Sequence, residues 1–475
     1  MLRVPPTTPS REDESDFSGS HHQWSEYLIC YIETTLAAAA APSEDASHSS
    51  CSSKFSGELH LLDGSGLRLT LHHPRSPCSP APLPDLPFST ILSHDEARAT
   101  YFAARLTKTV PRAASPLLQS AAVSVPLSPG NSIGVGNYVT RINLGTPGKS
   151  YSVVADTGSS LSWLQCSPCK VECHPQEGPL FNPSASATYR SVPCSASECD
   201  SLESATLNPA ACTMSNVCVY EATYGDGSFS VGYLSKDTLS LGSGRRLADF
   251  VYGCGQDNEG LFGRSAGLIG LARDRLSMPS QLAPTLGYGF SYCLPTTASS
   301  GYLSFGSNNP GRFSYTPMVS SSLDDSLYFI RLTGITVGGR GLPVSASAYT
   351  STPTIIDSGT VITRLPVDVY DALSSAVAAA LRGYRRAPAY SILDTCFRGS
   401  LSRLAVPAVD MVFQGGATLR LAARNVMIDV DGSTTCLAFA PSGSVAIIGN
   451  KQQQTFSVVY DVGRSRIGFA AGGCG

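Results

Sequence analysis

Hydrophobic and polar positions divide the chain into an irregular leader, a short patterned segment and a long region of strands. Residues 1–58 are rich in Ser, Ala and acidic residues and lack periodicity, which predicts a leader that is disordered or used for targeting. Residues 67–71 then alternate apolar and polar positions as a strand does, and residues 94–107 have the pattern of a helix. We interpret residues 59–136 as a prosegment and linker, because Ser, Pro and Gly dominate their last part.

Residues 137–475 contain an imperfect internal duplication. The stretch V-V-A-D-T-G-S at 153–159 recurs as T-I-I-D-S-G-T at 354–360. In each copy two apolar residues and a glycine follow much later, at 268–270 and 447–449. Because each copy places an aspartate at the end of an apolar strand, the duplication predicts two lobes whose acids meet between them.

Composition favours a β-rich fold and does not suggest a nucleic-acid partner. The chain has 44 Gly and 32 Pro, and runs rich in Val, Tyr and Phe lie between these turn signals. We expect an all-β fold with one lobe at residues 137–318, a second at 319–475 and an active-site cleft between them. Charged residues are only 15% of the chain, the net charge is −3 and no block of like charge occurs, so nucleic acid is not an expected partner. No run approaches the roughly 18 apolar residues of a membrane span.

The candidate chemistry lies in the two aspartates of the duplication, Asp156 and Asp357. In each copy the strand fixes the backbone, the glycine permits a sharp turn, and the hydroxyl residues can donate hydrogen bonds to the carboxylate. A solvated aspartate in a hairpin turn is the alternative for one copy alone. Two copies in matching context instead favour a pair that shares one proton, because neighbouring carboxylates cannot both ionise easily.

On these motifs the chain resembles the pepsin family, and most closely its plant nepenthesin-like branch, over residues 137–475. The resemblance implies a pepsin-like double β-barrel in which Asp156 and Asp357 activate water to cut peptide bonds, without a metal or other cofactor. The residues that would support this pair are Thr157, Gly158, Ser159, Ser358, Gly359 and Thr360.

The resemblance also identifies a flap at Y-G-D-G-S, residues 224–228. Tyr224 would hydrogen-bond Trp163, which stands seven residues after Asp156, and Gly225 would face the substrate. On its own this segment indicates only a glycine-rich hairpin with an aromatic residue. With the flap, the expected partner is a polypeptide bound in extended conformation through its backbone, and the protein is expected to be a monomer.

Cysteine usage predicts an oxidising compartment. The chain has 15 cysteines, and the set from Cys166 to Cys474 is even in number, which implies disulfides and the secretory route. The cell exterior or wall is the first expectation, with vacuole or plastid as alternatives. The apolar stretch 27–32 makes a poor signal peptide, because it follows acidic residues and is broken by Glu33.

A cysteine-dense stretch lies where nepenthesin-like enzymes carry an insertion. A zinc site made of Cys166, Cys169, Cys173 and His174 is the alternative for its first part, since thiolates and imidazole at short spacing bind zinc. The resemblance instead implies six disulfides: Cys166–Cys169, Cys173–Cys254, Cys194–Cys218, Cys199–Cys212, Cys293–Cys474 and Cys396–Cys436.

These observations together predict an aspartic endopeptidase that works at acidic pH after its prosegment is removed. We expect Arg98, Arg105 or Lys108 of the prosegment to pair with the negative charge of the two aspartates near neutral pH. One alternative is a catalytically inactive pepsin-fold binding protein, such as an inhibitor of glycoside hydrolases, and another is a disulfide-rich structural wall protein. The intact aspartate motifs and Tyr224 favour the enzyme.

Overall fold

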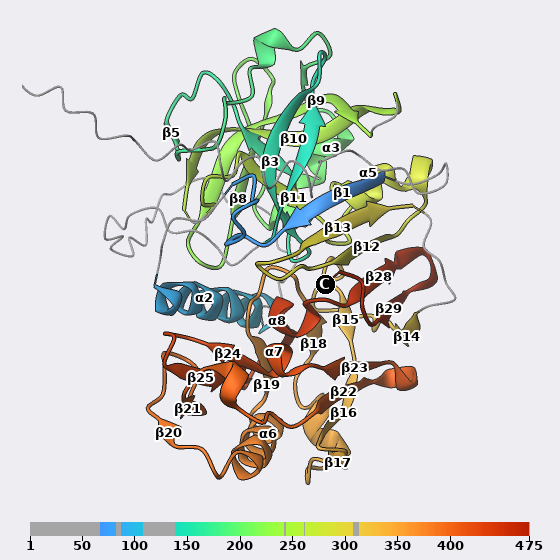
Figure 1. The fold of residues 1–475 in the computed structure, drawn as a ribbon. Coiled ribbons are helices and arrows are strands. Elements are labelled where there is room, and N and C mark those ends of the chain that lie inside the picture. The colour runs from blue at the N-terminus through green and yellow to red at the C-terminus, as the bar shows by residue number, and fades with distance from the viewer. Residues whose placement is uncertain are drawn as a thin grey trace, which may run out of the picture. The chain divides into compact units, whose positions relative to one another are not determined.

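The computed structural model describes residues 67–81, 87–107, 138–241, 244–260, 262–306 and 313–474. The chain separates into two units, Met1–Ala46 and Ser47–Gly475, and all described residues belong to the second. The whole of the leader predicted over residues 1–58, and Lys108, therefore lie outside the described residues. The second unit is built mainly of strands, which confirms the all-β prediction (Figure 1).

One large sheet contains every strand before residue 318 and the last two strands of the chain. In spatial order it consists of β14 (Ser314–Pro317), β29 (Arg466–Ala470), β28 (Ser457–Asp461), β12 (Phe290–Cys293), β13 (Ser300–Phe305), β1 (Leu67–His72), β2 (Val139–Leu144), β3 (Lys149–Asp156), β11 (Gly267–Gly270), β4 (Trp163–Gln165), β10 (Arg246–Glu259), β9 (Phe229–Ser240), β8 (Cys218–Thr223) and β7 (Ala211–Cys212), with β5 (Glu172–Cys173) on β10 and β6 (Arg190–Ser191) on β9.

Three smaller sheets form from residues 329–442 together with β27. The first has the order β15 (Phe329–Ile330), β18 (Thr354–Ile356), β27 (Ala446–Ile448), β19 (Thr363–Pro366) and β26 (Phe439–Ser442). The other two are β17 (Arg340–Gly341), β16 (Leu332–Val337), β22 (Val409–Phe413) and β23 (Thr418–Leu421), and β20 (Arg386–Ala387), β21 (Cys396–Arg398), β25 (Thr434–Leu437) and β24 (Met427–Asp429).

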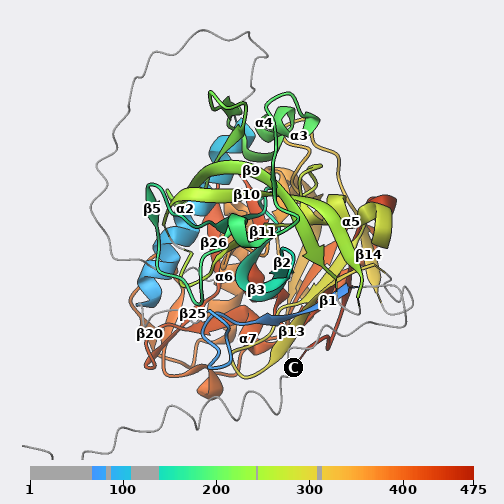
Figure 2. The ribbon, with the colours of Figure 1, turned by 90° about the horizontal axis from the view of Figure 1, so that it is seen from above.

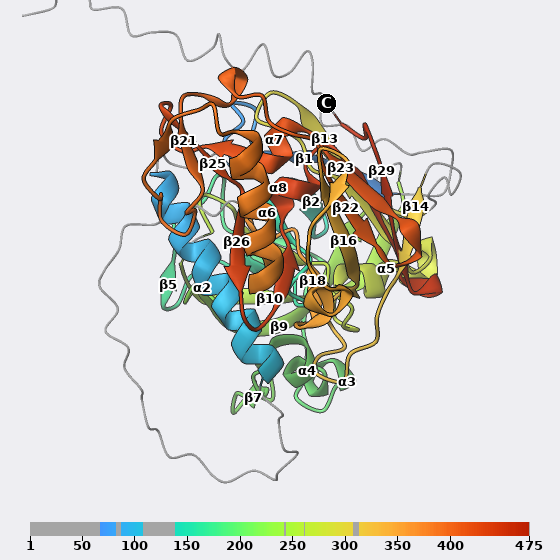
Figure 3. The same ribbon diagram turned by 90° about the horizontal axis from the view of Figure 1, so that it is seen from below.

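Helices are few and mostly short. The described α-helices are α2 (Phe88–Thr107), α3 (Ser197–Asp200), α4 (Leu202–Thr206), α5 (Met278–Leu286), α6 (Val367–Ala380), α7 (Ala423–Val426) and α8 (Asn450–Gln453). The described 3₁₀ turns are η1 (Pro183–Ala185), η3 (Ala346–Thr350), η4 (Leu401–Arg403), η5 (Gln414–Gly416) and η6 (Val462–Arg464). Seen from below the view of Figure 1, α6 and α2 are the two longest helices in the picture (Figure 3).

The internal duplication positions the site through two equivalent strand pairs. β3 runs parallel to β11, with Asp156 opposite Gly270, and β18 runs parallel to β27, with Ile356 opposite Ile448. Parallel strands buried on both faces are expected to be apolar, and the ends of these four strands next to the aspartates are mainly Val, Ile, Leu and Ala. Their apolar side chains pack in three clusters, and each fully buried Val or Ile contributes about 1.5–3 kcal/mol to folding. The strand ends that carry the aspartates are therefore rigidly supported.

The predicted prosegment packs directly on this body. β1 pairs antiparallel with β13 and buries Leu67, Leu69 and Leu71, as their alternation predicts. In Figure 1, α2 lies between the strands of residues 138–306 and those of the C-terminal part. The top view also places it next to the sheet that contains β26 (Figure 2). The helix begins at Phe88, six residues before the expected start, because its buried positions recur every three or four residues from Ile91 to Leu106.

The disulfides correct four of the six expected pairings. Cys293–Cys474 and Cys396–Cys436 form as expected. The structure otherwise pairs Cys166–Cys254, Cys169–Cys173, Cys194–Cys212 and Cys199–Cys218, so the other four expected pairs are wrong.

Strand register explains these corrections. β4 runs parallel to β10 with Leu164 opposite Cys254, and this register brings Cys166 next to Cys254. In the second cluster the buried Cys199 of α3 reaches the equally buried Cys218. The exposed Cys212 is then left for Cys194. Such neighbours across a sheet cannot be deduced from spacing along the chain.

Candidate active site

Asp156 and Asp357 meet at the centre of the candidate site. Asp156 is the last residue of β3, and Asp357 follows β18 directly. Their side chains are 0% and 1% exposed, so both carboxylates depend on protein donors instead of water.

Each carboxylate receives an equivalent set of hydrogen bonds from its own loop. Ser159 Oγ donates to Asp156 Oδ2 at 2.6 Å, and Thr360 Oγ1 donates to Asp357 Oδ2 at 2.6 Å. The amides of Gly158 and Gly359 donate to the other oxygen of each aspartate, at 3.1 and 3.2 Å. Donors of this kind stabilise the ionised form. The two loops therefore present a pair of carboxylates in nearly symmetric surroundings.

The two loops are joined to each other through Thr157 and Ser358. The amide of Ser358 donates to Thr157 Oγ1 at 2.8 Å, and the amide of Thr157 donates to Ser358 Oγ at 3.3 Å. These reciprocal bonds are the cross-brace expected from the resemblance. They fix the distance between the strand ends, so the aspartates cannot drift apart without breaking buried hydrogen bonds.

The sequence interpretation missed two further supports of the second loop. Asn450 Nδ2 donates to the carbonyl of Ser358 at 3.0 Å, and Gln453 Nε2 donates to the carbonyl of Asp357 at 3.1 Å. Both residues belong to α8, which directly follows the I-I-G motif at 447–449. In the sequence, these supports could have been found from the polar side chains that follow the apolar I-I-G motif.

Arg98 of α2 occupies the site. Its Nη2 lies 2.6 Å from Asp156 Oδ1 and 3.0 Å from Asp357 Oδ1, and its Nε lies 2.9 Å from Asp357 Oδ2. Burial raises the pKa of Asp357, but the charge of Arg98 and the hydrogen bonds to this carboxyl outweigh burial and lower that pKa below its ordinary value. The guanidinium therefore favours the ionised form of Asp357 and takes the place in which a reacting group would have to lie.

The other two basic candidates do not pair with the aspartates in the described structure. Arg105 is bound to Asp324, and its Nη2 donates to Ser326 Oγ at 2.6 Å. The expectation that Arg105 reaches the dyad, the pair of Asp156 and Asp357, is therefore wrong. Lys108 lies outside the described residues. Since Arg98 and Arg105 are seven residues apart on one helix, they lie on the same face, but only Arg98 is opposite the strand ends.

The flap folds over α2. Trp163 Nε1 donates to Tyr224 Oη at 2.8 Å, as expected, and Phe262 packs against both rings with centroids 4.8 and 5.6 Å away. A Cβ added at Gly225 would lie 2.3 Å from Cβ of Tyr101, so glycine permits the flap to approach the helix this closely. The segment predicted as the flap thus lies directly against α2.

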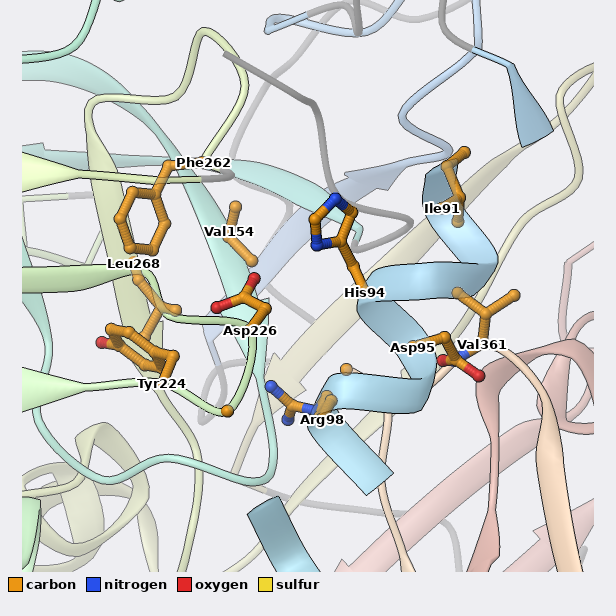
Figure 4. Close-up of a pocket in the computed structure, with 12 residues that line it drawn as sticks. Ile91, His94, Asp95, Arg98, Val154, Tyr224, Asp226, Phe262, Leu268 and Val361 are labelled. Atoms are coloured by element: carbon orange, nitrogen blue, oxygen red, sulfur yellow. The ribbon is translucent and has the colours of Figure 1, made fainter. Parts of the chain in front are cut away.

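A narrow pocket remains between the flap and α2. Figure 4 shows His94 and Arg98 on the helix side and Tyr224 and Asp226 on the flap side. Burial lowers the pKa of His94, while the charge of Asp226 opposes that effect. Arg98 forms part of the lining and contacts both aspartates, so α2 must move before a polypeptide can reach them.

A second acidic contact holds α2 beside the Asp357 loop, and the sequence interpretation missed it. The buried carboxylate of Asp95 accepts hydrogen bonds from the amides of Val361 and Ile362 and pairs with Arg364 at 3.0 Å. Leu92, one turn earlier, is fully buried in an apolar cluster of the C-terminal part. The helix is therefore attached along its length and not by Arg98 alone.

Two alternatives from the sequence can be compared with the described residues. Cys166, Cys169 and Cys173 all form disulfides, so they offer no thiolates to zinc, and His174 Nε2 lies 2.9 Å from the carbonyl of Ser265. Across the described ranges, no cluster of three acidic, His or Cys side chains is arranged to hold a metal ion. The helices in those ranges are too short or too polar to cross a membrane.

Comparisons with known proteins identify the relatives of this fold. A family model described as Xylanase inhibitor N-terminal matches residues 138–307, and one described as Xylanase inhibitor C-terminal matches residues 327–471. The chain is 43% identical over 390 residues to an aspartyl protease family protein of Arabidopsis thaliana, with 81% of this chain and 82% of that protein covered.

Two further matches agree in fold. The chain is 36% identical over 381 residues to the aspartic proteinase nepenthesin-2 of Nepenthes gracilis, covering 77% of this chain and 83% of that protein. The crystal structure of basic 7S globulin from soybean matches with a TM-score of 0.57 at 21% identity, covering 71% of this chain and 94% of the globulin.

Proposed function

Because this chain belongs to the plant family of pepsin-type aspartyl proteases, we propose that it is an aspartic endopeptidase made as a latent precursor. The observation that carries the proposal is the convergence of two intact aspartate loops, each with its own hydroxyl and amide donors, on one buried point. A binding protein has no need for such a matched pair.

The proposed mechanism begins once Arg98 has left the site. The two carboxylates then share one proton, the arrangement established for aspartic proteases. The ionised member takes a proton from a water held between them, and the water attacks the scissile carbonyl. The protonated member hydrogen-bonds the forming oxyanion, and protonation of the amide nitrogen releases the amine. Which aspartate is ionised is a property of the pair.

The protease is proposed to stay inactive as long as residues 59–136 remain bound as a prosegment. This prosegment precedes the two proposed lobes, residues 137–318 and 319–475. α2 blocks the dyad through Arg98 and lies beneath the flap through Tyr101. Acidic pH favours release because protonated aspartates no longer attract the guanidinium. Six disulfides among described residues support a destination on the secretory route, with the cell exterior or wall favoured over vacuole or plastid.

The second candidate function is inhibition of a glycoside hydrolase by a catalytically inactive pepsin fold. The observation that favours it is the description of the two matching family models as xylanase inhibitor domains. It leaves the intact dyad and the pairing with Arg98 without a purpose, so we place it second.

Cleavage of a denatured protein between about pH 3 and 5 tests the proposal. We expect peptide-bond cleavage by the acid-treated full chain, its loss in Asp156→Asn and its inhibition by a statine-type mimic of the transition state. Asp371→Asn, the same substitution at an exposed position of α6, is the matched control and should remain active. A folded and processed chain that cuts nothing would instead favour the inhibitor, which binding to xylanases would then test.

A further inference from the structure

A buried guanidinium lies on the wall beside the Asp357 loop, and among the described residues its acidic partners are both carboxylates of α2. Arg364 belongs to β19, and its side chain is 1% exposed. Its Nη2 lies 3.0 Å from Asp95 Oδ2 and 3.0 Å from Glu96 Oε2, both on α2. Within the described part of the chain, no carboxylate outside α2 lies within ion-pair distance of Arg364.

The remaining atoms of Arg364 show that the guanidinium is held in place by the protein body. Nη1 donates to the carbonyl of Ile362 at 3.2 Å, and Nε is buried without a hydrogen-bond partner among the described residues. The amides of Val361 and Ile362 donate to the same Asp95 carboxylate that Arg364 contacts. Three donors from the body thus converge on one carboxylate.

If α2 leaves the site, these three donors lose the carboxylate that accepts their hydrogen bonds. An uncompensated buried charge is costly, and arginine binds carboxylates well because its fork of N–H groups matches their geometry. Any peptide substrate must lie in the cleft that α2 vacates, because α2 blocks the dyad.

We infer that Arg364 is a specificity-determining residue that binds an acidic side chain, Asp or Glu, of the peptide substrate. This inference rests on the proposed protease function and adds a substrate class to it. Asp95 lies three residues before Arg98, about 4.5 Å along the helix axis. An extended peptide advances about 3.3 Å per residue, so the acidic residue is expected within about three residues of the scissile bond.

Peptide profiling of the activated chain tests the inference. The full chain, with a protease recognition sequence inserted between Thr107 and Tyr138, is cut there and acidified to release the prosegment. It is then given a peptide library derived from a whole proteome, at several values between pH 4 and 6. We expect Asp and Glu to be enriched at one position near the cleavage site in the parent and not in Arg364→Gln.

A matched pair of peptides with Glu or Gln at that position measures the effect. We expect the parent to prefer the Glu peptide by about tenfold in kcat/KM, the range of a charge-assisted hydrogen bond. Arg364→Gln should reduce the ratio to about one, and Arg364→Lys should restore part of it. The ratio should rise with pH as the glutamate ionises.

The outcomes separate this inference from the proposed function. A chain that cleaves peptides without a preference for Glu, or with one that Arg364→Gln leaves intact, would overturn the inference and leave the protease standing. If no peptide is cut, fluorescence anisotropy with the processed Asp156→Asn variant still measures binding of the same two peptides. Equal affinity for both would mean that Arg364 serves only to hold α2, and tighter binding of the Glu peptide would support the inference without catalysis.

Discussion

Arg98 and Asp357 form a two-point contact, in which Nε lies 2.9 Å from Oδ2 and Nη2 lies 3.0 Å from Oδ1. Such bidentate pairs are the strongest charge-assisted hydrogen bonds in proteins and fix the relative orientation of both groups. Lysine in the same position could offer only a point charge. The proposed latency would therefore depend on the shape of the guanidinium as well as on its charge.

Arg98→Gln is expected to expose the dyad without unfolding the body. The variant removes a cation from between two buried carboxylates, and one of them must then take up a proton. We expect a fluorescent statine-type ligand to bind the uncleaved variant at least about tenfold more tightly than the parent at pH 6, since breaking a buried pair costs several kcal/mol. Arg382→Gln, at an exposed position, is the control. Equal binding by parent and Arg98→Gln would mean that the flap and the remaining helix contacts suffice for latency.

Acid is expected to release the prosegment partly through Asp357. In the docked form the pKa of Asp357 lies below 3.8, its ordinary value. Its contribution to docking is therefore complete above that ordinary value and is lost as the pH falls through the lowered pKa. Asp357→Asn cannot titrate, so release of its prosegment should depend less steeply on pH below about 4.

His72, the last residue of β1, and His73, the residue after it, should start this release at higher pH. Burial, reinforced by nearby cations, lowers the pKa of His72 and of His73 to about 4 from 6.5. A released strand takes up these protons near pH 6.5, so the docking energy that depends on neutral histidines is present above 6.5 and is lost between 6.5 and 4.

Replacement of both histidines by Gln is expected to lower the pH of release by about one unit. The fraction of prosegment still bound can be followed by analytical ultracentrifugation after the chain has been cut between Thr107 and Tyr138. Both residues leave with β1, so the thermal stability of the released body should equal that of the parent. An unchanged midpoint would assign the acid response to the aspartates alone.

Tyr224→Phe tests the flap through its bond to Trp163. The substitution removes only the hydroxyl that accepts from Trp163 Nε1 at 2.8 Å and leaves a buried donor unsatisfied, which costs about 1–3 kcal/mol. If the bond orders the flap over substrate, kcat/KM should fall by about tenfold or more in the activated chain. Tyr233→Phe, on β9 and outside the pocket beside α2, is the control. A variant with lower thermal stability and normal kcat/KM would limit the bond to a structural role.

The dyad and its first supports could be predicted from sequence because they are local. Asp156, Ser159 and Trp163 lie within eight consecutive residues, and backbone geometry fixes their neighbourhood once the strand is known. The Asp357 loop repeats the same local pattern. The two lobes could also be predicted, because the motif occurs twice along the chain and each copy places a carboxylate at the end of an apolar strand.

Contacts between distant segments could not be predicted in the same way. The register between β4 and β10 decided the partner of Cys166, and nothing in cysteine spacing reports that register. The position of α2 along its own axis decided that Arg98 reaches the two aspartates while Arg105, about two turns further along the same face, is bound to Asp324. No sequence pattern pointed to Arg364, because it pairs with acidic residues more than 250 positions away. Its sequence separation from Glu96, for example, is 268 residues.

The cross-brace between Thr157 and Ser358 should appear as an energetic coupling between the two loops. Their side chains exchange hydrogen bonds with each other's backbone at 2.8 and 3.3 Å, so either single substitution, Thr157→Val or Ser358→Ala, breaks contacts made by both residues. The second substitution then has less left to remove, and the losses in the free energy of unfolding should not add.

A double-mutant cycle by denaturant unfolding measures that coupling, which we expect at about 1–2 kcal/mol within the usual range for contacting residues. Ser159→Ala combined with Ser358→Ala provides the control, because Ser159 donates to Asp156 and not to Ser358. The two loops come from opposite halves of the duplication, so a coupling near zero would mean that apolar packing alone sets the separation of the aspartates. A clear coupling would show that the geometry of the dyad depends on hydrogen bonds that neither half can form without the other.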